Sequence, residues 1–180
     1  MKSLHFKFTP KVLFFCLLGL WTLVKTCSAL FSELIPDEAY YFLYAQHLDW
    51  GYFDHPPMVA LFIKIGSFIH NELGVRLLAV ISQPIVLVVL WKMIDIKKYS
   101  FKDVFLFFGI AASITMFQVY GFIMTPDVPL LLFSSLFLLC YKKFLEKESC
   151  KSVILLGIII SCLLYSKYQA ILLLLWVLIS

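Results

Sequence analysis

The sequence predicts an all-α fold, in which several transmembrane helices form a polytopic bundle and shorter helices lie at the membrane interface in the first outer loop. Hydrophobic residues make up 62% of the 180 residues, whereas a soluble domain has about 45–50%. Mean hydropathy is +0.95, and the apolar residues form long runs. Only 14% of the residues are charged, and these cluster between the runs. The chain is therefore expected to reside in a lipid bilayer.

The cysteines and the net charge argue against other classes of protein. The five cysteines are scattered, form no CxxC pair and lie mostly in or beside apolar runs, where cysteine behaves as a small hydrophobic residue. They give no indication of a disulfide framework. The net charge of +4 arises from basic loops between apolar runs. This is typical of loops beside an anionic membrane leaflet rather than of a nucleic-acid-binding protein.

The first transmembrane helix is expected over residues 12–31, because this apolar run has about 20 residues, as a membrane crossing requires. The basic residues before it and the segment 26–29 also fit a cleaved signal peptide, and this alternative stays open. The later apolar runs predict further spans at about residues 73–91, 104–124, 128–141, 153–165 and 170–180. The last two are expected to be separate pieces that turn at Lys167, because an unpaired lysine at mid-bilayer would be costly.

Residues 32–72 are expected to form the first outer loop. Within it, the stretch 36–57 is rich in carboxylates and aromatic side chains and contains no lysine or arginine. A helix is expected to start just after Pro36, because Asp and Glu are favoured at a helix N-terminus, and the aromatic residues that follow suit the membrane interface. The segment 58–69 is apolar but too short to cross a bilayer, and it contains Lys64. A second interfacial helix is expected there.

The distribution of basic residues predicts the orientation. Eleven of the 15 lysines and arginines lie at the N-terminus, in residues 92–102 or in residues 142–151. With the spans above, these regions share one face, which the positive-inside rule assigns to the cytoplasm. The outer loop, the corner at 125–127 and Lys167 then share the other face. We therefore expect a multi-pass protein of the plasma (inner) membrane with a cytoplasmic N-terminus.

Asp37 and Glu38 are the leading candidates for chemistry on the outer face. Adjacent carboxylates in the first turn of a helix also act as a cap and as partners of the helix dipole, and spacing alone favours that structural role. In the functional interpretation, a carboxylate is the general base that accepts a proton from an attacking hydroxyl. Both interpretations place the pair at the depth of the lipid headgroups.

The other polar residues of the outer face have two interpretations each. His55 precedes two prolines that hold the chain extended, so it marks either the start of the next helix or a side chain directed at the site. Together with Asp54 it is only weak evidence for a metal site. Arg76 and Lys167 either extend their charges to the membrane surface or bind a phosphate. Asp127 either caps a helix or faces the site.

These residues occur in an order that resembles the membrane glycosyltransferases of the GT-C fold. The branch they resemble contains bacterial relatives of dolichyl-phosphate-mannose protein mannosyltransferase and of the lipid A aminoarabinose transferase. The motifs that carry the resemblance are Asp-Glu-Ala-Tyr-Tyr at 37–41, Leu-Asp-Trp-Gly-Tyr-Phe-Asp-His-Pro-Pro at 48–57, Gly74-x-Arg76, Thr125-Pro126-Asp127 and Ser166-Lys167-Tyr168. Single motifs are weak evidence, but their combination in order on one membrane face is specific.

The resemblance implies transfer of a sugar from a polyprenyl-phosphate donor to a hydroxyl of a lipid, glycan or protein acceptor outside the membrane. It casts Asp37 as the base, with Glu38 orienting the acceptor or binding a metal. Lys167 and Arg76 would neutralise the lipid phosphate, whose charge grows as it leaves. The other substrate-binding residues implied by the motifs are His55, Asp127 and Tyr168. A divalent metal is left open as a cofactor, with Glu38 and His55 as its candidate ligands.

Enzymes of this kind are several hundred residues longer, so residues 1–180 are expected to form the N-terminal part of a GT-C transferase domain. The chain ends within the apolar run 170–180, and the later spans of such enzymes help to form the lipid and acceptor sites. The alternatives are a non-catalytic membrane protein, such as a lipid-binding or transporter-like subunit, and an inactive truncated fragment.

Overall fold

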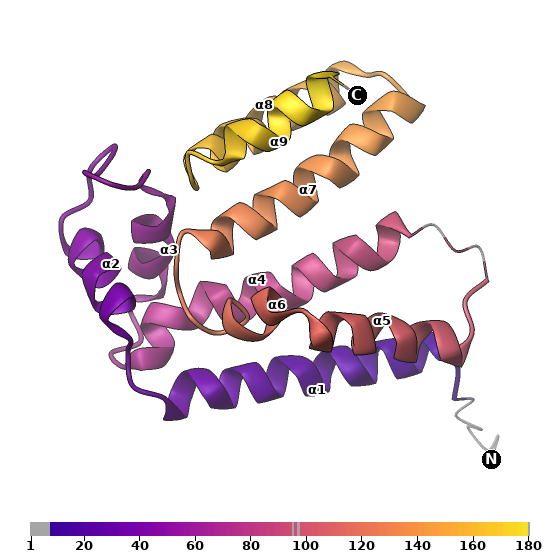
Figure 1. Ribbon diagram of the computed structural model, residues 1–180, viewed down its shortest axis with the longest axis horizontal. Coiled ribbons are helices and arrows are strands. Elements are labelled where there is room, and N and C mark those ends of the chain that lie inside the picture. The colour runs from indigo at the N-terminus through magenta and orange to yellow at the C-terminus, as the bar shows by residue number, and fades with distance from the viewer. Residues whose placement is uncertain (1–7, 95, 97, 180) are drawn as a thin grey trace, which may run out of the picture.

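The computed structural model describes residues 8–94, 96 and 98–179. Throughout these residues the regular secondary structure is helical (Figure 1), which confirms the predicted all-α class. In chain order the helices are α1 (Pro10–Phe31), α2 (Pro36–Gln46), α3 (Met58–Gly66), α4 (Glu72–Met93), α5 (Phe101–Ser113), α6 (Thr115–Val119), α7 (Asp127–Glu146), α8 (Cys150–Leu164) and α9 (Ala170–Ile179). Helices α1, α4 and α7 are long and apolar enough to cross a membrane. The chain is therefore a helical membrane bundle.

Helix α4 lies at the centre of the bundle. It packs between α1 and α7, and α8 lies against α7 (Figure 1). A larger share of α4 is buried than of α1 or α7. Buried apolar residues of α1, α4, α5 and α7 form one core cluster, which also includes residues of α2 and α3. A second cluster joins Phe137 of α7 to α8 and α9, so the C-terminal helices are attached to the bundle through α7.

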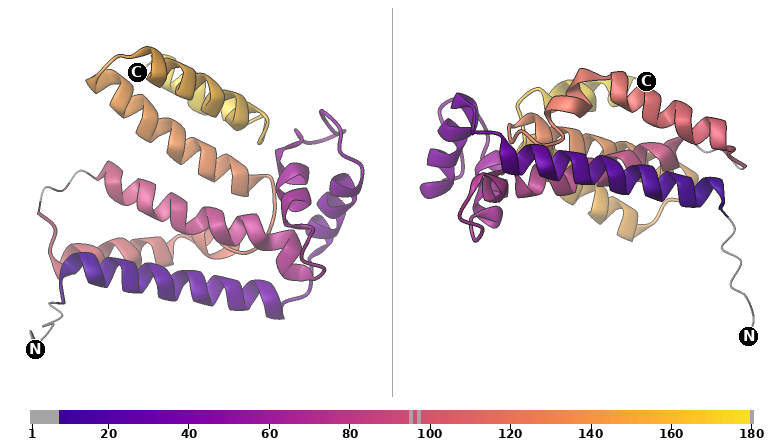
Figure 2. Two further views of the ribbon diagram at one scale, coloured as in Figure 1. Left: turned by 180° about the vertical axis from the view of Figure 1, so that it is seen from behind. Right: turned by 90° about the horizontal axis from the view of Figure 1, so that it is seen from below.

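Helices α2 and α3 lie together at one end of the bundle, where α1 ends and α4 begins (Figures 1 and 2). With 11 and 9 residues, they are too short to cross a membrane. The turn from α3 into α4 requires glycine at two positions. A Cβ on Gly74 would lie 2.0 Å from the carbonyl oxygen of Ile69, and a Cβ on Gly66 would lie 2.0 Å from that of Gly74. This close approach fixes the start of α4, and with it Arg76.

The segment 104–124, which was expected to be one continuous span, contains the two helices α5 and α6 instead. Between them Ile114 is extended, with φ −84° and ψ 112°. Polar contacts satisfy the backbone around this break. Gln118 Nε2 donates a hydrogen bond to the carbonyl oxygen of Ala112 at 3.0 Å. Lys25 Nζ donates to the carbonyl and side-chain oxygens of Gln118 at 2.8 Å each. A buried lysine of α1 thus stabilises the break.

The C-terminal part of the chain turns where the sequence predicts. Helix α8 ends at Leu164 and α9 begins at Ala170, so Lys167 lies in the turn between them. Helix α7 begins at Asp127 and continues beyond the expected end of its span to Glu146. Because α7 and α8 pack against each other as an antiparallel pair (Figure 1), the turn at Lys167 returns to the end of the bundle at which α7 begins.

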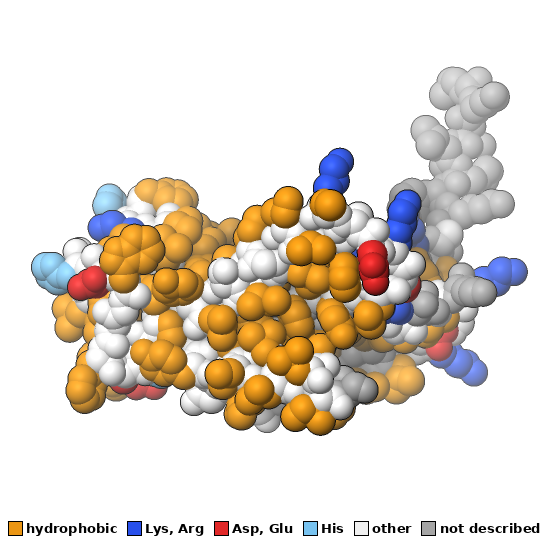
Figure 3. All heavy atoms as spheres, turned by 90° about the horizontal axis from the view of Figure 1, so that it is seen from above, with side chains coloured by type: hydrophobic (Ala, Val, Ile, Leu, Met, Phe, Trp, Pro, Cys, Tyr) orange, Lys and Arg blue, Asp and Glu red, His pale blue; other side chains and the backbone are white. Residues whose placement is uncertain are grey.

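The charged residues are unevenly distributed along the bundle. On the face in Figure 3, the histidine side chains lie at the end formed by α2 and α3, whereas most visible lysine and arginine side chains lie toward the opposite end. The surface between the two ends is largely apolar. The positive-inside rule associates such a pattern with a cytoplasmic end rich in basic residues. The orientation in the membrane stays a prediction that this pattern supports.

Candidate functional site

Separate segments of the chain meet at the end of the bundle that carries α2 and α3. The backbone N–H of Met58, at the start of α3, donates a hydrogen bond to the carbonyl oxygen of Tyr165 at 3.1 Å. The N–H of Met124, in the corner before α7, donates to Glu38 Oε1 of α2 at 2.9 Å. The outer loop, the α6–α7 corner and the α8–α9 turn are therefore tied together. These are the segments in which the sequence predicts site residues.

Asp37 is an exposed carboxylate in the first turn of α2. Pro36 occupies the first helical position, where its fixed φ and missing N–H suit a helix start, and the two acidic residues that follow suit the positive end of the helix dipole. Among the described residues, no hydrogen bond or ion pair to the Asp37 side chain is formed. Its carboxylate is therefore free to accept a proton or a hydrogen bond from a ligand.

Glu38, the next residue, is directed into the protein and is 0% exposed. Its Oε1 accepts hydrogen bonds from Arg76 Nε at 2.7 Å and from the N–H of Met124 at 2.9 Å. Its Oε2 accepts from Arg76 Nη2 at 2.5 Å and from the N–H of Ile35 at 3.2 Å. Each carboxylate oxygen thus has two donors. This arrangement leaves Glu38 no capacity for a metal ion or an acceptor hydroxyl.

Arg76 of α4 is also fully buried. Besides the two hydrogen bonds to Glu38, its Nη1 donates to the carbonyl oxygens of Ala29 and Ser32 at 3.1 and 2.7 Å. Its Nη2 donates to the carbonyl oxygen of Glu33 at 2.8 Å. A guanidinium has five N–H groups, and all of them have acceptors here. Arg76 therefore joins the end of α1 to the start of α2 and has no N–H left for a phosphate.

Asp127 and Lys167 form a second ion pair, which is only partly buried. Lys167 Nζ lies 2.8 Å from Asp127 Oδ1 and 2.9 Å from Oδ2. The lysine side chain is 20% exposed and the aspartate side chain 18%. Asp127 opens α7 and Lys167 lies in the turn after α8. An ammonium group has three N–H donors, so this lysine keeps one for a ligand that enters from solvent.

Tyr41 lies one turn after Asp37 on α2, and nearby carboxylates affect its pKa. Burial, together with the negative charges of Asp37, Asp54 and Asp127, raises its pKa to about 12. The three carboxylates belong to α2, to the loop after α2 and to α7. Because all of them act on one phenol group, they lie around the same part of the structure. The sequence did not single out Tyr41, although it belongs to the Asp-Glu-Ala-Tyr-Tyr motif.

A tyrosine network holds the loop after α2 against the helix. Tyr44 donates a hydrogen bond to Asp54 Oδ1 at 2.6 Å. The single proton of the Tyr40 hydroxyl is shared between the Tyr44 oxygen and the same Asp54 oxygen, which lies 3.3 Å away. The ring of Tyr52 stacks on that of Tyr44 at 3.8 Å. Burial would raise the pKa of Asp54, but the hydrogen bond from Tyr44 and the nearby His55 outweigh it, so that pKa is lowered. Asp54 is thus committed to the loop.

His55 lies beside Tyr41, with the ring centroids 5.6 Å apart in an edge-to-face arrangement. Its Nε2 is 3.9 Å from Asp54 Oδ2, and its buried Nδ1 has no hydrogen-bond partner among the residues that the structure describes. Within the same residues, the buried hydroxyl group of Thr125 also lacks a partner. In the described part of the chain, no group of three or more His, Cys, Asp or Glu side chains could hold a metal ion. Because Glu38 is also saturated, these residues do not fit the suggested metal.

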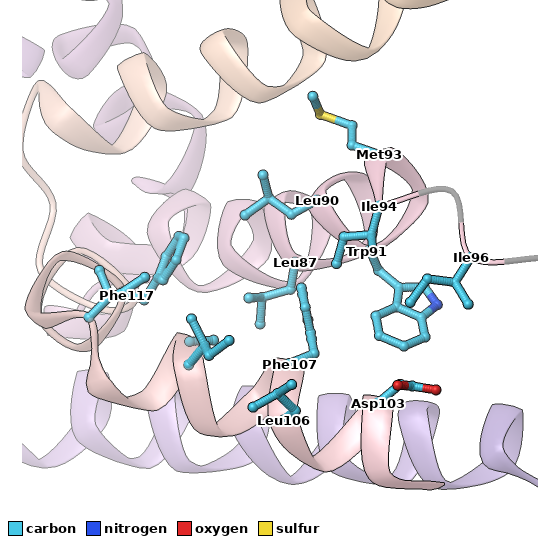
Figure 4. A pocket seen from close by; sticks show the side chains of 13 residues that line it. Leu87, Leu90, Trp91, Met93, Ile94, Ile96, Asp103, Leu106, Phe107 and Phe117 are labelled. Atoms are coloured by element: carbon cyan, nitrogen blue, oxygen red, sulfur yellow. The ribbon is translucent and has the colours of Figure 1, made fainter. Parts of the chain in front are cut away.

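Tyr168 is exposed and lines a cavity of about 200 Å³ beside the loop. The same cavity is lined by Trp50 and Pro57. A larger cavity, of about 550 Å³, lies between α4 and α5 near the basic end of the bundle (Figure 4). The described residues of its wall are almost entirely apolar, and the carboxylate among them, Asp103, accepts hydrogen bonds from Ser100. No predicted site residue lines this larger cavity.

A comparison with protein families assigns the chain. The family model described as dolichyl-phosphate-mannose-protein mannosyltransferase matches residues 54–180. The chain belongs to this family. It is therefore a relative of the GT-C membrane glycosyltransferases, as its motifs indicate. Neither the curated proteins nor the solved structures include a match to it.

The family match covers some of the candidate residues and not others. His55, Arg76, Asp127 and Lys167 lie within the matched range, and so does Tyr168. The two adjacent carboxylates of α2 precede it. The family therefore identifies the chain as glycosyltransferase-like, whereas the contrast between the exposed and the buried carboxylate of α2 comes from the fold.

Proposed function

We propose that the protein transfers a sugar from a polyprenyl-phosphate donor to an acceptor hydroxyl, at the end of the bundle that carries α2 and the α8–α9 turn. The mannosyltransferase family supports a glycosyltransferase and a lipid-linked donor. The predicted orientation makes this end the outer face of the membrane. The acceptor is a hydroxyl of a lipid, glycan or protein.

The observation that carries this proposal is the exposed Asp37 carboxylate beside the buried, saturated Glu38. In the reaction, the acceptor oxygen attacks the anomeric carbon while Asp37 accepts the proton of the hydroxyl. The bond between the anomeric carbon and the phosphate oxygen breaks, and the lipid phosphate leaves with the electron pair. A base must be accessible to the acceptor, and Asp37 meets that requirement.

Lys167 is the proposed partner of the leaving phosphate. Charge grows on the phosphate as the bond to the sugar breaks, so a cation at that position stabilises the transition state more than the ground state. Lys167 is partly exposed and binds Asp127 through two of its N–H groups at most. The carboxylate of Asp127 holds the ammonium group in position.

Glu38 and Arg76 are proposed to act through the fold and not by touching substrate. Their ion pair joins α1, α2, α4 and the corner before α7. The pair therefore sets the first turn of α2, and with it the position of Asp37. This assignment replaces a metal-binding role for Glu38 and a phosphate-binding role for Arg76.

Substitution of Asp37 by asparagine tests the base. Removal of a general base reduces the rate by about 10²–10⁴-fold, so we expect Asp37→Asn to lose sugar transfer to that extent while its membrane insertion and unfolding temperature stay unchanged. Transfer is measured from radiolabelled polyprenyl-phosphate sugar in membranes that contain the protein. Glu33→Gln is the matched control, because Glu33 is another exposed carboxylate just before α2. Equal transfer by Asp37→Asn and wild type would rule out this base.

Cysteine labelling tests the face at which the reaction occurs. Gly51 is exposed, and a Cβ there would meet nothing within 4 Å, so Gly51→Cys is sterically free. In a background in which the native cysteines are replaced by serine, an impermeant thiol reagent should label Gly51→Cys from outside intact cells. Lys98→Cys, at the opposite end of the bundle, should be protected. Labelling of Lys98→Cys alone would reverse the proposed orientation.

A further inference from the structure

A cavity of about 450 Å³ lies between α2, α3 and the start of α4. Its volume lies within the range of about 300–1,000 Å³ that is typical of small-molecule sites. One part of its wall is apolar and includes Phe42, Ile63 and Val75. The candidate carboxylates and lysine of the transferase site do not line it, so this cavity is separate from the proposed reaction.

The other part of the wall carries both signs of charge. Lys64, His70 and Glu72 line the cavity together with the amide of Gln46. Within the described residues, none of these four side chains forms a hydrogen bond or an ion pair, and Lys64 and Glu72 are not paired with each other. A cation donor and a carboxylate acceptor are therefore both available in one cavity.

Neighbouring polar groups are already used by the fold. The hydroxyl of Ser67 donates to the carbonyl oxygen of Lys64 at 2.7 Å, and Asn71 Oδ1 accepts the N–H of Gly74 at the start of α4. These contacts close the α3–α4 turn. They leave Lys64 and Glu72 as the charged groups that a ligand would meet.

The position of the cavity suggests the kind of ligand. It lies at the start of α4, a helix long enough to cross a membrane, and beside two helices that are too short to do so. Phospholipid headgroups lie at this level in a bilayer. A ligand there would meet apolar side chains on one side and charges of both signs on the other.

We infer that this cavity binds a phospholipid headgroup that contains both a phosphodiester and a primary ammonium, as in phosphatidylethanolamine. Lys64, with His70 beside it, binds the phosphate, and Glu72, with the Gln46 side-chain oxygen, accepts hydrogen bonds from the ammonium. The apolar wall receives the first part of an acyl chain. Charge-assisted hydrogen bonds of this kind are the strong polar contacts of a binding site.

The same groups select against related lipids. Phosphatidylglycerol has a net negative charge and no cation for Glu72. A polyprenyl monophosphate also lacks a cation and carries more negative charge. Phosphatidylcholine has a cation but no N–H to donate to a carboxylate. The inference does not rest on the proposed transferase reaction, because neither its residues nor its lipid takes part in sugar transfer.

Lipid retention measured by native mass spectrometry tests the inference. The purified protein is delipidated in detergent and then offered phosphatidylethanolamine, phosphatidylcholine or phosphatidylglycerol with identical acyl chains. We expect one phosphatidylethanolamine to bind about tenfold more tightly than either other lipid, which corresponds to one charge-assisted hydrogen bond. Lys64→Met and Glu72→Gln should each remove this preference. Lys92→Met, an exposed lysine at the other end of α4, should keep it.

Three results of these measurements would contradict the inference. Equal binding of the three lipids by the wild-type protein would overturn the inference without any variant, as would tighter binding of phosphatidylglycerol. If Glu72→Gln instead strengthens the binding of a polyprenyl monophosphate at the expense of phosphatidylethanolamine, the cavity belongs to the sugar donor. Unchanged unfolding temperatures of the variants, whose substituted side chains are exposed, show that lost lipid binding does not reflect lost folding.

Discussion

The ion pairs Arg76–Glu38 and Lys167–Asp127 lie at the same end of the bundle. They differ in whether their hydrogen-bonding groups remain available to a ligand. In Arg76–Glu38, both side chains are buried and every N–H and each carboxylate oxygen has a partner within the protein. In Lys167–Asp127, both side chains are about one-fifth exposed, and the lysine retains a donor.

This difference assigns different tasks to chemically similar pairs. A saturated, buried pair can only hold the surrounding segments in place, because a ligand would have to displace its partners. An accessible pair can hold its own groups in position and still contact a ligand. The sequence alone does not show which pair is structural and which can bind a ligand, because Arg76 and Lys167 are both cations near the end of an apolar helix.

Breaking the buried pair should have the largest effect on folding. Arg76→Lys keeps the charge but replaces five donors in a planar fork by three, so buried carbonyl oxygens and part of Glu38 lose their partners. We expect this variant to lose about 1–3 kcal/mol of the free energy of unfolding for each buried acceptor that is left without a donor. Thermal and denaturant unfolding in detergent micelles measure the loss. A variant as stable as the wild-type protein would show that this pair does not hold the fold.

Breaking the accessible pair should affect catalysis far more than folding. Lys167→Met should cost less stability than Arg76→Lys, because the Lys167–Asp127 pair is partly solvated and, among the described residues, the lysine side chain holds no other segment. It should reduce sugar transfer by about 10²–10³-fold, the usual effect of removing one group that stabilises transition-state charge. Lys98→Met, an exposed lysine outside the site, is the control for both measurements. Destabilisation as large as that of Arg76→Lys would abolish the proposed distinction.

The sequence predicted the long helices better than it predicted the break near residue 114. The expected spans 12–31 and 73–91 correspond to α1 and α4 within two residues at each end, because hydrophobic length alone defines such helices. At the break between α5 and α6, Gln118 is hydrogen-bonded to Lys25, which is 93 residues away in the sequence. No local pattern contains that information.

In the candidate site too, local sequence motifs identified the residues, but tertiary contacts determined their roles. Asp37 and Glu38 were expected to share the site because both belong to a motif that resembles the glycosyltransferase family. Adjacent residues of an α-helix point about 100° apart, and the structure places one carboxylate in solvent and the other in the core. The sequence left open whether Arg76 extends its charge to the membrane surface or binds an anion. That the anion is Glu38 required the tertiary structure.

The carboxylate of Asp54 is intermediate between the exposed Asp37 and the buried Glu38. Changes around Asp54 should have the smallest effect of those predicted, a shift of its pKa. Asp54 is accessible, yet hydrogen bonds from Tyr44 and Tyr40 hold it. Its pKa is below the usual value, so the hydrogen-bonded form is fully present above the pKa of the unfolded chain and is lost as the pH falls through the lower pKa of the folded state. The loop after α2 should therefore stay attached to the helix in mildly acidic solution.

Tyr44→Phe should raise the pKa of Asp54 toward its ordinary value of 3.8, because the closest donor is removed. Tyr40→Phe is the matched control. Its hydrogen bond is longer, at 3.3 Å against 2.6 Å for Tyr44, so it should produce a smaller shift in the same direction. Carboxyl ¹³C chemical shifts of labelled aspartate, followed from pH 6 downward, measure both pKa values. Equal shifts from the two variants would mean that the two phenol groups stabilise the carboxylate jointly. No shift from either variant would show that neither tyrosine holds Asp54.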